Sequence, residues 1–174
     1  MNPLRHGLYS LVLITAAGSA MADVIFEDDF AQGTGTFATE GRVYTGNYGI
    51  RMRGGVASGS SVTSSAISTQ GYENLVLQFR REASGLDSGE TGTASVSING
   101  GAFTPLESIT DGNAATMDFP LPDTASGKNI RVRFALQASS FFETYTIASL
   151  TLNGDGGDEP PAECPGGPEC PVEP

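Results

Sequence analysis

The clearest structural pattern in the chain lies in residues 130–138, which read IRVRFALQA. Ile130, Val132, Phe134 and Leu136 share one side of an extended backbone, and the arginines and the glutamine take the other side. A period of two residues is typical of a strand with one buried face and one face in solvent. We therefore predict a half-buried β-strand here.

The same period recurs along the chain. Leu75, Leu77 and Phe79 repeat it, and so do Ile50 and Met52. Weaker strand candidates are 24–30, 37–44, 61–68, 93–98, 103–109, 116–121 and 145–152. Turn-forming residues separate them, and no stretch has a convincing helical period. Nine or ten short strands predict an all-β fold, an antiparallel two-sheet β-sandwich, with a jelly roll as the leading topology and an immunoglobulin-like sandwich as the alternative.

Residues 1–22 have the pattern of a secretory signal peptide. Arg5 and His6 precede an apolar run from Leu8 to Ala17, and Ala20-Met21-Ala22 has the small residues that signal peptidase requires. The alternative is a buried N-terminal helix. The apolar run is shorter than the roughly 20 residues of a membrane span, and no later segment approaches that length. We expect cleavage after Ala22 and a secreted product, extracellular or periplasmic.

The mature chain is strongly acidic. All 20 acidic residues follow Ala22, whereas one of the nine basic residues, Arg5, leaves with the signal peptide, so the net charge becomes −12. Such a surface disfavours nonspecific binding to nucleic acid and to anionic membranes. We expect neither as a partner.

Catalytic residue types are scarce. His6 is the one histidine of the chain and there is no tryptophan. Without an imidazole the mature chain cannot build a Ser-His-Asp triad, and it has neither a zinc-binding cluster of histidine or cysteine nor a Gly-rich phosphate loop with its lysine. Paired carboxylates of the glycosidase kind would still be possible, but the acidic residues are dispersed. We expect a protein that is not an enzyme.

The composition changes after Asn153. Residues 154–174 hold six prolines, five glycines and six acids, which predicts a disordered tail or linker and leaves 23–153 as one domain. Cys164 and Cys170 flank five turn-prone residues, so a local disulfide is expected outside the cytoplasm. A bridge to another chain, or to another part of a longer precursor, is the alternative.

Several short motifs resemble those of jelly-roll accessory modules of secreted bacterial proteins, which are similar to carbohydrate-binding and adhesive sandwiches. The motifs are FEDDF at 26–30, GTG at 33–35, YGIRMRG at 48–54, LVLQF at 75–79, SINGG at 97–101 and IRVRF at 130–134. The resemblance implies a module that often sits beside a hydrolase domain. Related modules often place an acidic residue and an asparagine before the last apolar positions, where this chain has Ile147-Ala148-Ser149-Leu150.

A structural Ca²⁺ ion is the one cofactor that the sequence suggests. Glu27, Asp28 and Asp29 supply hard oxygen ligands on the first strand, and Glu143 could add another from the opposite end. The alternative is a charged edge that prevents association between sheets.

Five of the eight mature basic residues fall at outward positions of predicted strands: Arg51, Arg53, Arg80, Arg131 and Arg133. If their strands share a sheet, they form a positive strip that suits the carboxylates of acidic polysaccharides, because a guanidinium can bind two oxygens at once. The alternative is salt bridging to neighbouring acids, at most about 1 kcal/mol for each exposed pair.

Three functions follow from these patterns. The first is a secreted, non-catalytic binding module for polysaccharide or another cell-surface component. The second is the N-terminal accessory module of a secreted hydrolase whose catalytic domain is not in this chain. The third is a structural or adhesive surface protein.

Overall fold

The computed structural model describes residues 22–156, which form β-strands and one short 3₁₀ helix, η1 (Asp123–Ala125). The strands are β1 (Asp23–Asp28), β2 (Ala38–Glu40), β3 (Arg42–Gly46), β4 (Gly49–Arg53), β5 (Ser60–Thr63), β6 (Ile67–Ser68), β7 (Tyr72–Ser84), β8 (Thr91–Ile98), β9 (Thr104–Ile109), β10 (Gly112–Pro120), β11 (Asn129–Gln137) and β12 (Thr144–Gly156). The predicted signal peptide up to residue 21, the two cysteines and the tail from residue 157 lie outside the described residues. Within residues 22–156 there is no helix of the length and apolarity that a membrane span needs.

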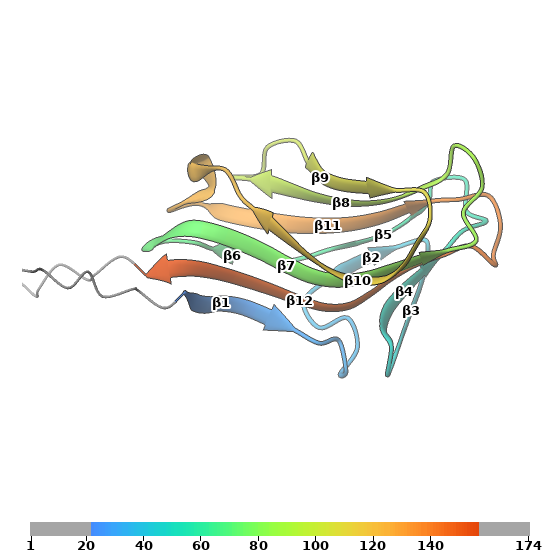
Figure 1. Cartoon of the computed structure of the whole chain (residues 1–174), viewed down its shortest axis with the longest axis horizontal. Coiled ribbons are helices and arrows are strands. Elements are labelled where there is room, and N and C mark those ends of the chain that lie inside the picture. Colours follow the sequence, from blue (N-terminus) through green and yellow to red (C-terminus); the bar gives the residue numbers. More distant parts are fainter. Residues whose placement is uncertain (1–21, 157–174) are drawn as a thin grey trace, which may run out of the picture.

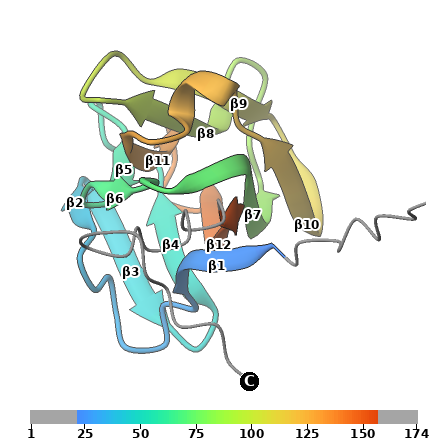
Figure 2. The same cartoon turned by 90° about the vertical axis from the view of Figure 1, so that its left-hand side faces the viewer.

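The strands form two antiparallel sheets that pack face to face (Figures 1 and 2). Sheet A has the order β10-β7-β12-β4-β3, with β1 also paired to β12, and sheet B has the order β2-β5-β11-β8-β9, with β6 also paired to β11. The sets β4-β12-β7-β10 and β5-β11-β8-β9 are the two four-stranded sheets of a jelly roll, in which the chain crosses repeatedly between layers. The predicted all-β sandwich with jelly-roll topology is confirmed.

The inward faces of the strands make the core. Ile130, Val132 and Phe134 of β11 are fully buried, as the two-residue period predicts. The Phe134 ring packs edge-to-face on Phe79 of β7, with 5.1 Å between ring centroids, and joins the two layers. Burial of one such side chain stabilises the fold by about 1.5–3 kcal/mol.

Two of the predicted strands are divided. Residues 37–44 were expected to form one strand, but the chain leaves sheet B after β2 and enters sheet A at β3. Gly41 lies between them with φ 72°, and a Cβ there would come within 2.5 Å of the Gly59 carbonyl oxygen. Residues 61–68 likewise separate into β5 and β6, both paired to β11.

β12 carries a bulge in its middle. Tyr145 and Ile147 point into the core, and the next inward residues are Leu150 and Leu152, so one extra residue lies between the two pairs. The register with β7 shifts between Ile147 and Ser149, which leaves Ala148 unpaired. Bulges of this kind re-aim side chains and are frequent near functional sites.

The two ends of the described chain lie together. Asp23 pairs with Gly154 across β1 and β12, whereas the loops β4–β5, β7–β8 and β11–β12 gather at the opposite end of the sandwich (Figure 1). β12 continues through Gly156, three residues beyond the domain boundary expected at Asn153.

Candidate functional site

A groove of about 290 Å³ crosses the outer face of sheet A, which faces away from sheet B. We refer to it as the sheet A groove. Residues of β4, β7, β10, β12 and the β3–β4 turn line it: Asn47, Tyr48, Arg51, Arg80, Arg81, Glu82, Ala114, Thr146 and Ala148.

The strand register explains the shape of this groove. Arg51 of β4 lies opposite Thr146 of β12, which lies opposite Glu82 of β7. Because neighbouring strands are about 4.8 Å apart, the long side chains of β4 and β7 stand roughly 10 Å apart. The floor between them consists of the small residues Thr146 and Ala148. The groove is therefore a channel with two polar walls.

Two contacts fix the guanidinium of Arg51. Its Cζ lies 4.1 Å from the centroid of the Tyr48 ring, and its Nε donates to Thr146 Oγ1 at 3.2 Å. Among the described residues, the terminal nitrogens of Arg51 have no hydrogen-bond partner. This side chain thus presents two N–H-bearing groups in a set orientation.

The turn that carries Tyr48 depends on one glycine. Gly46 pairs with Gly49, so Asn47 and Tyr48 form a two-residue hairpin loop. Gly49 has φ 95°, and a Cβ there would lie 2.2 Å from the Ile147 carbonyl oxygen. The absence of a side chain lets β4 approach the bulged part of β12 closely.

On the β7 wall, adjacent arginines have different roles. Arg80 is exposed, whereas the ion pair found among residues 22–156 joins Arg81 to Glu107 of β9. Arg81 Nη2 lies 2.6 Å from Glu107 Oε1, the two side chains are 11% and 10% exposed, and this hydrogen bond raises the pKa of Arg81. The pair ties the two sheets together and leaves Arg80 as the outward cation of this wall.

The five predicted arginines do not form one strip. Arg51, Arg53 and Arg80 belong to sheet A, whereas Arg131 and Arg133 belong to β11 of sheet B, so the two groups face opposite sides of the sandwich. The condition that their strands share a sheet is therefore not met. A period of two residues shows which side chains share a face of a strand, but not which sheet the strand joins.

Arg53 and Arg133 are also occupied by other contacts. Arg53 Nη1 donates to the Phe141 carbonyl oxygen at 3.3 Å and its guanidinium lies 4.4 Å from the Phe141 ring centroid. Arg133 lies 5.7 Å from the ring centroid of Phe103. Of the five arginines, Arg51 and Arg80 are the two that line the sheet A groove.

Glu27, Asp28 and Asp29 line a separate hollow of about 400 Å³ beside residues 149–151 of β12. Asp28 Oδ1 accepts the N–H of Phe30 at 2.7 Å, and Asp29 Oδ1 accepts the N–H of Ala31 at 2.9 Å. Two of the three carboxylates therefore already fix the turn that follows β1.

Glu143 does not join them, which corrects the four-residue calcium site. Asp28 pairs with Leu150, whereas Glu143 precedes the first residue of β12, at the far end of that strand. Glu143 instead meets Asp87 and Glu90, and the three carboxylates place oxygen atoms within 4.8 Å of one another. Ca²⁺ prefers oxygen ligands of this kind, so this is a set that could hold a cation, and calcium binding stays a prediction.

Neighbouring backbone groups hold this acidic cluster. Glu143 is 4% exposed and accepts the N–H of Ser140. Glu90 accepts the N–H groups of Asp87, at 2.8 Å, and Ser139, at 2.7 Å. These hydrogen bonds hold the pKa of Glu90 below its usual value. Asp87 and Glu90 were not expected at this site, because they lie more than 50 residues before Glu143 and no local pattern links them to it.

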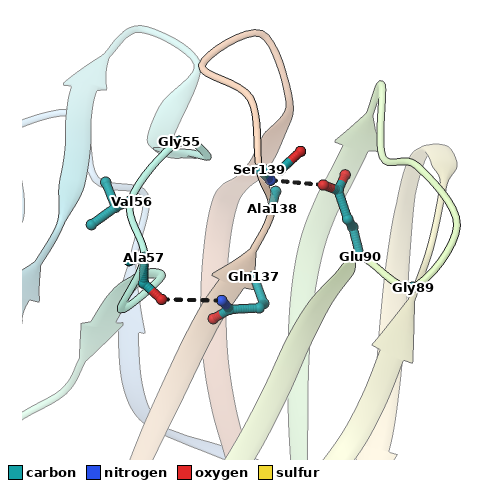
Figure 3. Close-up of a pocket in the computed structure, with 8 residues that line it drawn as sticks. All are labelled: Gly55, Val56, Ala57, Gly89, Glu90, Gln137, Ala138 and Ser139. Carbon is teal, nitrogen blue, oxygen red and sulfur yellow. Dashed lines mark hydrogen bonds between the residues drawn. The ribbon is translucent and has the colours of Figure 1, made fainter.

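A third cavity, of about 450 Å³, lies at the loop end (Figure 3). Its lining residues are Gly55, Val56, Ala57, Gly89, Glu90, Gln137, Ala138 and Ser139. The longer polar side chains there are engaged within the protein, Glu90 with Ser139 and Gln137 with the Ala57 carbonyl oxygen at 3.5 Å (Figure 3). No aromatic ring lines this cavity, although Phe142 of the β11–β12 loop is 84% exposed. The sheet A groove offers more unengaged polar groups.

The fold is similar to that of several solved structures. The K3 cleaved adhesin domain of Lys-gingipain from Porphyromonas gingivalis is 12% identical, with a TM-score of 0.52 over 76% of this chain and 99% of that domain. The CBM22-1 xylan-binding domain from Paenibacillus barcinonensis Xyn10C is 10% identical, with a TM-score of 0.51 over 80% and 99%. TmCBM61, solved in complex with β-1,4-galactotriose, is 12% identical, with a TM-score of 0.51 over 71% and 92%.

At these identities the likeness establishes the fold, and it confirms at that level the predicted resemblance to carbohydrate-binding and adhesive sandwiches. The chain spans about a third, 34%, of the length of a family two carbohydrate esterase from Cellvibrio japonicus, to which it is 18% identical over 77% of its own length, with a TM-score of 0.48. No protein-family model matches the chain, and no curated protein matches it.

Proposed function

We propose that this chain is an exported, non-catalytic polysaccharide-binding module that holds its ligand in the sheet A groove. The observation that carries the proposal is the fixed guanidinium of Arg51 beside Tyr48, facing Arg80 and Glu82 across a floor of small residues. Sugar hydroxyls both donate and accept hydrogen bonds. Walls that carry N–H donors and a carboxylate acceptor complement them, and the half-buried Tyr48 adds apolar surface.

The solved structures of the same fold support this proposal. One is described as a xylan-binding domain and another is bound to β-1,4-galactotriose. The fold can therefore present saccharide-binding surfaces, although the ligand of this chain must come from its own groove.

Binding without bond cleavage fits the residues of the groove. A glycosidase needs two carboxyl groups about 5–9.5 Å apart around the scissile bond. Glu82 is the one carboxylate among the residues that line the described groove. Export rests on the signal-peptide pattern of residues 1–22, and attachment to a hydrolase is the alternative that the tail suggests.

Affinity electrophoresis of the mature chain tests the proposal. Gels that contain xylan, galactan or polygalacturonate should retard the protein in at least one case. Tyr48→Ala should weaken the retardation about tenfold or more, which is the loss expected for one packed ring, whereas Phe142→Ala should leave it unchanged.

Phe142→Ala serves as the control because that ring is the most exposed aromatic of the loop end. If Phe142→Ala abolished the retardation and Tyr48→Ala did not change it, the binding site would lie at the loop end instead. Failure of every polysaccharide to retard the protein would overturn the proposed function.

A further inference from the structure

Building on the proposed function, we infer that the sheet A groove selects polysaccharides that carry carboxylate groups, with Arg51 and Arg80 as the residues that bind the carboxylate. Both line the groove, on its opposite walls, and neither forms an ion pair among residues 22–156.

Arg51 is the better oriented of the two. Because Tyr48 covers one face of its guanidinium and Thr146 accepts from Nε, the side chain has little rotational freedom left. Its two terminal nitrogens are free among the described residues to donate in parallel. A planar carboxylate matches this pair of donors, and charge-assisted hydrogen bonds of this geometry are about twice as strong as neutral ones.

Arg80 supplies the second cation from β7. It lies opposite Ser149, next to the β12 bulge, and thus diagonally across the floor from Arg51. Arg80 is exposed and its neighbour Arg81 is already neutralised by Glu107. A saccharide in the groove would therefore meet one unpaired arginine on each wall.

The local charge of the groove has the opposite sign to that of the whole protein. Arg51 and Arg80 outnumber the single acid, Glu82, although the chain as a whole carries −11. Glu82 lies directly across Thr146 from Arg51, where it can accept from sugar hydroxyls. Because the cations lie at the surface, salt should weaken the binding of an acidic polymer.

Arg131 provides a matched control. It is an exposed arginine on the outer side of sheet B and lines a hollow with Ala66, Asn99, Gly100 and Asn129, which contains no aromatic ring. Removing Arg131 changes the net charge as much as removing Arg80 does. A difference between these two variants therefore reports the position of the charge and not its amount.

The test compares polygalacturonate with the same polymer after reduction of its carboxyl groups to alcohols. We expect polygalacturonate to retard the mature chain and the reduced polymer to do so at least about tenfold less. Arg80→Gln and Arg51→Lys should each weaken retardation by about tenfold, the effect of losing one charge-assisted hydrogen bond, whereas Arg131→Gln should not. Melting temperatures of the three variants verify that each is folded.

Each other outcome contradicts the inference in a distinct way. If the reduced polymer or neutral xylan retarded the protein as strongly as polygalacturonate does, the selection for carboxylates would be overturned. The proposed function would still stand. Equal retardation by dextran sulfate would indicate a general anion surface and would also overturn the selection. Loss of binding in Arg131→Gln, with Arg80→Gln unaffected, would assign the site to sheet B.

Discussion

Gly49 shows how a single residue positions the candidate site. The turn before β4 brings the backbone onto the bulged part of β12, and the missing side chain permits the contact. We predict that Gly49→Ala destabilises the protein by at least about 3 kcal/mol, because the new Cβ would overlap a backbone carbonyl and the φ of 95° disfavours alanine.

The matched control is Gly100→Ala. Gly100 also has a positive φ, of 72°, but a Cβ there would meet nothing within 4 Å. This variant should lose only about 1–2 kcal/mol, the cost of the left-handed conformation. Urea unfolding of both variants measures the difference in free energy of unfolding. Equal losses of stability would show that the close contact with β12 does not make Gly49 more sensitive to substitution than Gly100.

Tyr145 gives a prediction that depends on pH. Its hydroxyl is fully buried without a hydrogen-bond partner among the described residues, and burial raises the pKa of this phenol well above its usual 10.0. Below pH 10 both the folded and the unfolded chain keep the proton. Above it the unfolded chain loses the proton first, so folding stability falls as the pH rises.

Tyr145→Phe should therefore be at least as stable as the parent at neutral pH, and its advantage should grow as the pH rises above 10. Thermal unfolding across that range measures the effect. A loss of more than about 1 kcal/mol at neutral pH would contradict the unpaired state of this hydroxyl, because a loss of that size is typical of a broken hydrogen bond.

At the level of elements, the end of β12 sets the limit of the folded domain. The backbone of Asp155 pairs with Glu73 and that of Gly156 with Tyr72, and Asn74 Nδ2 donates to Asp155 Oδ2 at 2.8 Å. We predict that a chain ending at Gly156 keeps the melting temperature of the mature protein. A chain ending at Asn153 should melt about 3–8 °C lower, because it loses these pairings.

Differential scanning calorimetry of the two truncated chains provides the comparison. Equal melting temperatures for both would contradict the contribution of the last β12 residues. A large loss in the chain that ends at Gly156 would instead show that the tail stabilises the domain.

Elements with a regular period could be predicted from the sequence. In β11, β7 and β4 the alternation of apolar and polar residues predicted which side chains face the core, and those side chains are buried. The break at Gly41 was missed because it interrupts a run of strand-forming residues. The bulge of β12 did leave a signal, since the inward residues Tyr145, Ile147, Leu150 and Leu152 are spaced by two, three and two.

At the level of the whole molecule, the sequence could not assign strands to sheets. The sequence indicated five arginines on strands, but β11 packs in the other layer from β4 and β7, so the expected strip divides between two opposite faces. Long-range pairing brings Tyr48, Arg51, Arg80 and Thr146 together from three separate parts of the chain. Such a set has no local pattern, and the groove had to be found in the structure.

The groove crosses β4, β12 and β7 of sheet A near the start of β12, whereas the two ends of the described chain lie together at the opposite end of the sandwich (Figure 1). A ligand in the groove therefore lies away from the two ends of the described chain. What we propose, then, is that a polysaccharide binds in the sheet A groove.

Backbone amide NMR would locate the binding surface residue by residue. The mature chain, labelled with ¹⁵N, would be titrated with oligosaccharides cut from the polysaccharide that retards it. We predict that the largest chemical-shift changes fall on the amides of 48–51, 80–82 and 146–148, around the sheet A groove. Changes concentrated in the loops 54–59, 85–90 and 138–143, or on the outer face of sheet B, would contradict it.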